Sequence, residues 1–300
     1  MLFLSRTLPA LLCGSLLSFS AHAAKLAIVI DDFGYRPAEE NKVLAMPAAI
    51  SVAVLPNAPH AREMATKAHQ RGHEVLIHLP MAPLSKQPLE KDTLTPEMSS
   101  DEIARIIREA SGKVPYAVGL NNHMGSKMTS SLAGMQKVMQ VLNHYNYYFL
   151  DSMTIGNSQA VAAAQGTQVK VVKRRVFLDD NQNEAMVRQQ FTRAVKLAQR
   201  DGSAIAIGHP HPTTVRVLQQ MLPSLPADVT LVTPGQLLNE PLRHTTKPAA
   251  AAPAKPASAH FRAPALCKVS ATPVPQQRAV EIIGEGLMQN PFMLKLKALF

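Results

Sequence analysis

The sequence predicts an α/β protein: an irregular (β/α) barrel of about seven to eight strands, followed by a Pro/Ala-rich C-terminal tail. Two observations lead to this expectation. From residue 25 to about residue 240, short apolar runs typical of strands alternate with stretches typical of helices, which favours parallel strands joined by right-handed crossovers. About eight such units in about 220 residues fit a compact barrel, and a doubly wound parallel sheet is the alternative.

The expected strands follow the apolar runs along the chain. In order, they lie at 26–30, 50–54, 74–77, 117–120, 147–150, 169–172, 204–208 and 229–232. The clearest helical stretches between them are 58–70, 99–112, 130–144, 183–200 and 212–221. The helix at 99–112 has a good start, because Ser99 offers a capping hydroxyl and acids at 101 and 102 fall in its first turn.

The N-terminal residues 1–23 are interpreted as a signal peptide. Arg6 gives a thin positive region, residues 8–19 form a short apolar stretch, and Ala21-His22-Ala23 is a small-x-small cleavage site. Export to an oxidising compartment, most simply a bacterial periplasm, is therefore expected. Cys13 would be removed with this segment, so the mature chain would keep one thiol, Cys267, and no intrachain disulfide.

Residues 24–244 are expected to form the barrel domain and residues 245–300 a non-globular tail. The tail begins as an Ala/Pro-rich linker and ends in an apolar stretch with a few lysines. A dispensable tail is the favoured interpretation, and an amphipathic helix that contacts a membrane or a protein partner is the alternative. Gly284, Gly286 and Pro291 oppose a continuous helix there. The tail holds seven basic and two acidic residues, or +5, and Arg6 adds one charge in the signal peptide, so the barrel carries about +4 of the formal net charge of +10.

Composition narrows the function classes. The chain lacks basic residues interleaved with aromatics, so no nucleic-acid partner is expected. Tryptophan is absent and aromatics make up only 5%, which weakens any sugar-binding platform built from indole rings.

Reactive side chains gather where predicted strands end. Five of these strands carry a carboxylate or imidazole within a few residues of the C-terminal end: Asp31, Asp32, His78, His123, Asp151, His209 and His211. In a barrel these ends converge on one mouth. Each side chain also has a structural explanation, such as a helix cap for Asp151 or a buried core histidine for His78.

The adjacent pair Asp31-Asp32 carries the strongest chemical signal. Two neighbouring carboxylates repel unless a cation or a shared proton relieves them. One carboxylate and two imidazoles suit a borderline cation such as Zn²⁺, while a second carboxylate can accept a proton from water. With a histidine across the mouth as proton donor, this is the equipment for metal-assisted hydrolysis of an amide or ester.

Four segments resemble motifs of a known family. Ile30-Asp31-Asp32-Phe33-Gly34 is similar to the first motif of polysaccharide deacetylases, and the segment 72–78 is similar to the lead into their second motif. The variants Asn-Asn-His-Met-Gly-Ser, at 121–126, and Gly-His-Pro-His-Pro, at 208–212, look most like divergent polysaccharide deacetylases. The resemblance covers about residues 25–240 and implies an irregular (β/α) barrel.

The resemblance also implies roles for the metal-binding residues. Asp31 would be the general base, and Asp32 and His78 would be metal ligands. The second histidine of the second motif should fall at position 82, where this chain has Ala82. We expect His123 to supply the third ligand, with Zn²⁺ as the most suitable metal.

The remaining roles concern proton donation and the substrate. Carried over from the family, His209 would protonate the leaving group, and Asp151 would orient the His209 ring. Asn122 and Ser126 would bind substrate or support the metal shell, and His211 is a further candidate for substrate binding.

Three functions are compatible with this pattern. The leading hypothesis is a periplasmic deacetylase in which metal-bound water attacks an N- or O-acetyl group of an envelope glycan such as peptidoglycan. The second is a catalytically degenerate barrel that binds glycan or an envelope protein, which Ala82 favours and Asp31 opposes. A metallophosphatase-like hydrolase is the third, weakened because no phosphate-binding glycine-rich loop is present.

Overall fold

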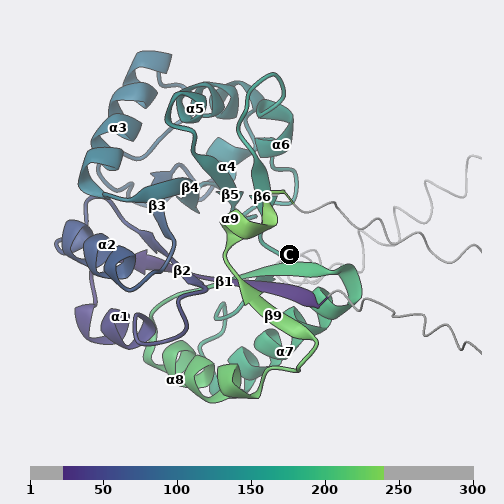
Figure 1. Ribbon diagram of the computed structural model, residues 1–300. Helices are drawn as coiled ribbons and strands as arrows, with labels where there is room; N and C mark the ends of the chain where they lie inside the picture. Colours follow the sequence, from purple (N-terminus) through teal and green to yellow (C-terminus); the bar gives the residue numbers. More distant parts are fainter. Residues whose placement is uncertain (1–22, 240–300) are drawn as a thin grey trace, which may run out of the picture. The chain divides into compact units, whose positions relative to one another are not determined.

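The computed structural model describes residues 23–239 of the chain (Figure 1). The expectations for the signal peptide, apart from Ala23, and for the tail at 245–300 lie outside the described residues. Within the described part, no helix has both the length and the apolar character needed to cross a bilayer.

Nine strands and nine α-helices form the described part of the chain. The strands are β1 (Ala24–Phe33), β2 (Ile50–Val54), β3 (Val75–Met81), β4 (Ala117–Met124), β5 (Tyr148–Asp151), β6 (Val171–Lys173), β7 (Val176–Phe177), β8 (Ser203–Gly208) and β9 (Val229–Val232). The helices are α1 (Pro37–Val43), α2 (Ala61–Gln70), α3 (Ser100–Lys113), α4 (Ser126–Thr129), α5 (Leu132–Tyr145), α6 (Ala160–Ala163), α7 (Glu184–Asp201), α8 (Pro212–Met221) and α9 (Pro234–Leu237), with a 3₁₀ turn at Leu222–Ser224.

All nine strands belong to one parallel sheet. Eight follow the order β6-β5-β4-β3-β2-β1-β8-β7. β9 pairs with the first residues of β1, 24–27, while β2 pairs with residues 28–33. Since β8 pairs with β1 along residues 25–30, β9 and β2 must share the opposite edge of β1.

The two ends of this strand order lie close together. β6 pairs with β5 and β7 pairs with β8, yet only Arg174 and Arg175 separate β6 from β7. The Arg174 N–H donates to the Asp151 carbonyl at 3.0 Å and the Arg175 N–H to the Ile205 carbonyl at 2.8 Å. Three peptide steps reach at most about 11 Å, so the sheet must curl until its edges nearly meet. The predicted barrel-like fold is thus confirmed over the doubly wound alternative.

The two faces of the sheet bury different residues. Residues on the outer face of β1, such as Leu26 and Ile28, pack in one large cluster with apolar side chains of the covering helices. Ala27 and Val29 of β1 instead belong to a smaller cluster of alternate strand residues, to which α9 contributes Leu237. This smaller cluster fills the concave interior, so period-two alternation decides which side chains can reach the mouth.

Several strands extend beyond their apolar runs. β3 continues through His78 to Met81, and β4 continues through Asn121 to Met124, because polar residues still pair across the ladder, as His78 does with Asn121. The sequence did not predict the two-residue strand β7 or the four-residue helices α4, α6 and α9. Elements this short have too few residues to show a period.

Candidate metal centre

Alternation brings three reactive side chains into the interior of the barrel mouth. Asp31 continues the inward series of Ala27 and Val29, His78 follows Leu76, and His209 follows Ile205 and Ile207. Asp31 and His78 are almost fully buried, whereas His209 keeps partial access to solvent. The expectation that these side chains share one mouth matches the geometry.

Asp32 reaches the same mouth by a different route. By alternation it would point toward the covering helices, but the register between β1 and β2 gains one residue between Ile30 and Phe33. Asp32 also adopts the left-handed conformation, with a φ of 58°. A bulge of this kind redirects a side chain and is frequent beside active sites.

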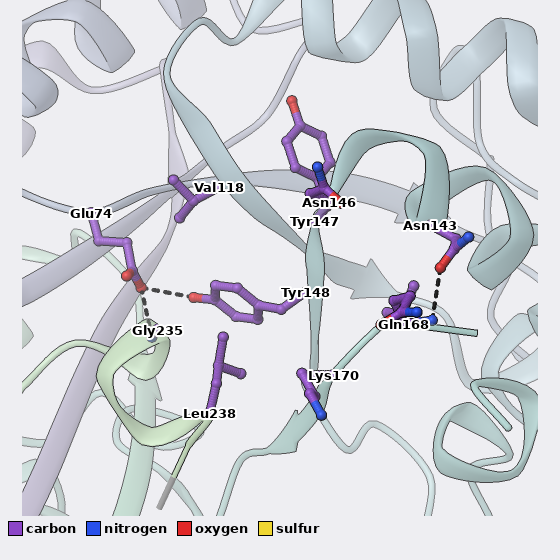
Figure 2. A pocket seen from close by; sticks show the side chains of 11 residues that line it. Glu74, Val118, Asn143, Asn146, Tyr147, Tyr148, Gln168, Lys170, Gly235 and Leu238 are labelled. Carbon is purple, nitrogen blue, oxygen red and sulfur yellow. Dashed lines mark hydrogen bonds between the residues drawn. The ribbon is translucent and has the colours of Figure 1, made fainter. Parts of the chain in front are cut away.

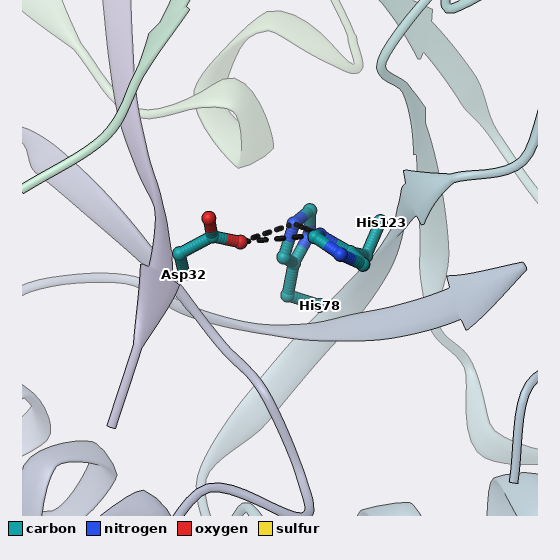
Figure 3. Close-up of side chains that lie close together, drawn as sticks. All are labelled: Asp32, His78 and His123. Carbon is teal, nitrogen blue, oxygen red and sulfur yellow. Dashed lines mark hydrogen bonds and ion pairs between the residues drawn. The ribbon is translucent and has the colours of Figure 1, made fainter. Parts of the chain in front are cut away.

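Asp32, His78 and His123 bring one ligand atom each into a nearly equilateral triangle (Figure 3). Asp32 Oδ1 lies 3.2 Å from His78 Nε2 and 3.1 Å from His123 Nδ1, and these two nitrogens lie 3.1 Å apart. His123 comes from the neighbouring strand, where the ladder pairs it with Pro80, two residues past His78.

The triangle fits a bound metal ion. Four ligands placed tetrahedrally about 2.0–2.2 Å from zinc lie roughly 3.3–3.6 Å from one another, so the observed edges match one slightly compressed face. Asp32 Oδ1 is buried and, among the described residues, has no partner with hydrogen-bond geometry. An acceptor left unsatisfied between two imidazoles is expected where three lone pairs converge on a cation.

Asn121 fixes both the metal-side nitrogen of His78 and the position of Asp31. Its Nδ2 donates to Asp31 Oδ1 at 2.8 Å, which leaves Oδ1 of the amide facing His78 Nδ1, also at 2.8 Å. His78 Nδ1 therefore carries the proton and Nε2 is free to bind a metal. The sequence analysis cited Asn122 and missed Asn121, although alternation in β4 with Gly119 and His123 could have identified it.

The two adjacent carboxylates have opposite ionisation properties. Burial raises the pKa of Asp31 above its ordinary value, against the opposing influence of the charges on His78 and His209. Burial acts in the same direction on Asp32, but the adjacent imidazoles of His123 and His78 hold its pKa well below its ordinary value. Asp32 thus suits a ligand that stays ionised, whereas Asp31 suits a group that accepts a proton.

The acid that orients His209 is Asp179, which corrects the expectation for Asp151. Asp179 Oδ1 lies 3.0 Å from the ring nitrogen Nδ1 of His209, and Asp179 Oδ2 accepts the backbone N–H of His209 at 2.7 Å. Asp179 follows Phe177 on the inward face of β7. Asp151 has the outward phase of Phe149, and its Oδ1 accepts the Met153 N–H at 2.8 Å.

The surroundings of His209 favour its protonated form. Burial lowers its pKa, but the hydrogen bond and charge of Asp179, with the charges of Asp32 and Asp31, outweigh this and raise the pKa to about 9. With Nδ1 bonded to Asp179, the opposite nitrogen Nε2 lies 3.8 Å from Asp32 Oδ2, at the edge of the ligand triangle.

Arg174 is a further residue that the sequence analysis missed. Its Nε donates to the Ser152 carbonyl at 2.6 Å and its Nη2 to the Met153 carbonyl at 2.9 Å. The guanidinium lies 4.9 Å from the centroid of the Phe177 ring. Burial lowers its pKa, and the negative charges of Asp31 and Asp151 oppose that shift, so Arg174 supplies positive charge behind the carboxylates.

The predicted substrate-binding residues separate into two kinds. Asn122 is buried and uses its amide to hold the Ser152 N–H and the Met124 carbonyl, while Ser126 Oγ accepts the Leu84 N–H at 2.8 Å. These two residues therefore tie loops together around the mouth. His211 lies beside His209, with the Arg36 guanidinium 3.0 Å from its Nδ1.

Asp179, His209 and His211 form a second group with the spacing of metal ligands. Their contacts favour a different role. Asp179 already accepts hydrogen bonds from His209 and from the Thr214 hydroxyl, at 2.7 Å. The guanidinium of Arg36 next to His211 would repel a second cation. The contacts of Asp179 therefore favour a role in orienting His209 rather than in binding a metal.

A pocket of about 580 Å³ lies at the opposite ends of the strands (Figure 2). It is lined by Glu74 before β3, Val118 in β4, Tyr148 in β5 and Lys170 before β6. The one acidic side chain in this lining already has hydrogen-bond partners: Glu74 accepts hydrogen bonds from the Tyr148 hydroxyl at 2.7 Å and the Thr233 hydroxyl at 2.8 Å. The reactive groups are instead concentrated at the carboxyl ends, as in barrel enzymes.

Two bacterial proteins are similar in sequence to most of this chain. A protein of Escherichia coli (strain K12), "Uncharacterized protein YibQ", is 67% identical over 281 residues, which are 93% of this chain and 88% of that protein. An uncharacterized protein of Haemophilus influenzae is 44% identical over 220 residues, covering 73% and 79% of the two chains.

Solved structures extend the likeness of the fold. The crystal structure of an uncharacterized protein from Agrobacterium tumefaciens C58 gives a TM-score of 0.67 at 18% identity, covering 73% of this chain and 90% of that one. At this identity the likeness concerns the fold alone. Residues 28–238 match the family model described as divergent polysaccharide deacetylase. This match over most of the chain shows that the protein belongs to the divergent polysaccharide deacetylase family.

Proposed function

We propose that the protein is a metal-dependent hydrolase that removes acetyl groups from an envelope glycan. The observation that carries this proposal is the triangle of Asp32, His78 and His123, with Asp31 and His209 placed beside it. A metal site alone would not need a second buried carboxylate of raised pKa and a protonated imidazole at its edge. Their presence supports a reaction in which one proton is taken up and another is released.

Asp31 is the proton acceptor in this proposal. When bound, a Zn²⁺-type ion would polarise the acyl carbonyl and lower the pKa of water, which the open position of a three-ligand site allows. Asp31 Oδ1 accepts the amide hydrogen of Asn121, which holds the carboxylate in place. Because its pKa is raised by burial, the Asp31 carboxylate can take a proton from the attacking water.

His209 is the proton donor. Its Nδ1 donates to Asp179 Oδ1 and is thereby fixed, so the proton available to a substrate is the one on Nε2. Nε2 would deliver that proton to the leaving nitrogen or oxygen as the acyl bond breaks. In this proposal, His211 and Arg36, which contact each other beside His209, contact the remainder of the substrate.

The location and the substrate rest on the sequence and on the family. Residues 1–23 have the features of a cleaved signal peptide, which favours the periplasm. Peptidoglycan or a related envelope glycan is the polymer present in that compartment. Zn²⁺ is the metal that best suits one carboxylate and two imidazoles.

Metal content and acetate release test the proposal together. The mature protein should hold about one Zn²⁺ per chain and release acetate from acetylated glycan fragments. The Asp32→Ala and His78→Ala variants should lose the metal, whereas Asp31→Asn should keep it and lose turnover. Asp180→Asn, a neighbouring exposed acid, is the matched control and should change neither property.

Two other results point to the alternative functions. Wild-type protein that binds glycan and metal but releases no acetate would establish a binding barrel. Release of phosphate from model esters, without release of acetate, would establish a phosphatase instead. Wild-type protein that takes up no metal from Zn²⁺, Co²⁺ or Ni²⁺ would overturn the hydrolase mechanism.

A further inference from the structure

His123 has a carboxylate behind it as well as the ligand triangle in front. Its Nδ1 faces Asp32 and His78, and its other ring nitrogen, Nε2, lies 3.4 Å from Glu90 Oε1. Glu90 belongs to the β3–α3 loop, residues 82–99. Metal-binding histidines almost always donate their second N–H to an acceptor, which fixes the tautomer and the ring plane.

The other histidine of the triangle is fixed in a different way. His78 is buried, and its Nδ1 donates to Asn121, whose own position is set by Asp31. His123 lies near the end of β4 and remains 16% exposed on its side chain. Glu90 therefore occupies, for the more exposed ligand, the position that Asn121 occupies for the buried one.

The β3–α3 loop contacts the start of α4 and the end of β4 at regular intervals. The Leu84 N–H donates to Ser126 Oγ at 2.8 Å, Gln87 Nε2 lies 2.8 Å from Met124 Sδ, and Glu90 then meets His123. The far end of the loop returns to β3, because the Leu94 N–H donates to the Pro80 carbonyl at 2.9 Å. Hydrogen bonds on both sides of Glu90 therefore hold the loop so that Glu90 lies beside His123.

The same loop explains how the site is completed despite Ala82. Ala82 is buried, and its carbonyl accepts the N–H groups of Lys127 and Met128 at the start of α4. Position 82 therefore serves to anchor α4, and the third ligand comes from β4. A ligand supplied by the strand end needs its own orienting acceptor.

We propose that Glu90 is the positioning residue that holds His123 in the orientation required of the third metal ligand. This inference rests on the proposed metal site and adds a residue that neither alternation nor the family motifs indicate. The simplest competing explanation is an exposed ion pair, because the Glu90 side chain is 39% exposed. Such pairs contribute little to folding stability, so the two explanations differ in metal affinity.

The test is the dissociation constant for Zn²⁺, measured by chelator competition on the full mature chain, with Co²⁺ absorption as a second readout. Glu90→Ala should weaken binding roughly 10- to 100-fold and alter the ligand-field bands of bound Co²⁺. Glu90→Gln should recover most of the affinity, because its amide oxygen keeps an acceptor facing His123 Nε2. The melting temperature of the metal-free protein should stay unchanged in both variants.

Glu97→Gln is the matched control. Glu97 lies in the same loop, is more exposed, and pairs with Lys127 at 2.7 Å rather than with the triangle. Its substitution removes the same charge and should leave metal affinity unchanged. Wild-type metal affinity in Glu90→Ala, or an equal loss of metal affinity in Glu97→Gln, would overturn the positioning role of Glu90 and leave the proposed metal site standing. A wild-type protein that binds neither Zn²⁺ nor Co²⁺ would overturn the proposed metal site as well.

Discussion

Carboxylates lie at both ends of the sheet, but the groups that surround them differ in kind. At the amino ends, Glu74 receives hydrogen bonds from the neutral hydroxyls of Tyr148 and Thr233. At the carboxyl ends, Asp31 and Asp32 face the ionisable rings of His78, His123 and His209. Neutral donors satisfy a carboxylate in one fixed state, whereas ionisable neighbours can exchange protons with it.

Because of this difference, substitutions at the amino ends should mainly affect folding stability, and substitutions at the carboxyl ends should mainly affect the reaction. Removal of a group that neutral donors satisfy leaves those donors unpaired and destabilises the fold. Removal of one member of the ionisable cluster also relieves repulsion and unsatisfied acceptors, so its main cost should fall on the reaction. Substitutions at the two ends should therefore change different measured quantities.

The largest effect is expected for the proton donor. His209→Asn should lower the rate of acetate release by roughly 10²- to 10⁴-fold, because Asn has no ionisable proton to give to the leaving group. The bound metal should remain, since His209 is not one of the three triangle residues. Steady-state kinetics with metal analysis checks both points, and an unchanged rate would remove His209 from the mechanism.

The next effect concerns the opposite end. Glu74→Ala should lower the free energy of unfolding by about 2–3 kcal/mol, because Tyr148, Thr233 and the Gly235 N–H lose their shared acceptor. Zinc affinity should not change. Urea unfolding of the metal-free protein measures the first quantity and chelator competition the second. A loss of zinc affinity together with full stability would contradict the proposed division between the two ends.

A smaller effect concerns the pKa of His209 in the metal-free protein. NMR titration should place it near 9 in the wild type, since Asp179 raises it. Because the folded-state pKa is raised, its contribution to stability is complete below about pH 6.5 and is lost as the pH rises through 9. Asp179→Asn should lower this pKa by at least about one unit, or about 1.4 kcal/mol, whereas Asp151→Asn should change it less.

The smallest effect is expected for Tyr148→Phe. The substitution keeps the ring that packs in the barrel interior and removes only the hydroxyl donor to Glu74. Thr233 and Gly235 still bond to that carboxylate, so the cost should be about 0.5–1.5 kcal/mol. Urea unfolding beside Glu74→Ala provides the comparison. A cost as large as that of Glu74→Ala would mean that one hydroxyl, rather than the network, satisfies the acid.

Much of the mouth was predictable from alternation along single strands. Asp31, His78 and His209 continue inward-facing apolar series, whereas Asp179 follows β7, a strand too short to show that period. The choice of Asp151 was wrong for a physical reason, since it shares the outward phase of Phe149. Alternation also fails for Asp32, because a local bulge reverses its direction.

The sequence by itself determined the order of the longer strands and helices and most of the strand ends that carry acids and imidazoles, because burial imposes a period on each segment separately. Only the tertiary structure decided which of these groups meet. The register of β4 against β3 brings His123 to His78, and the β3–α3 loop brings Glu90 to His123. Such contacts depend on how segments far apart in the chain are aligned, and the pattern within one segment does not predict that alignment.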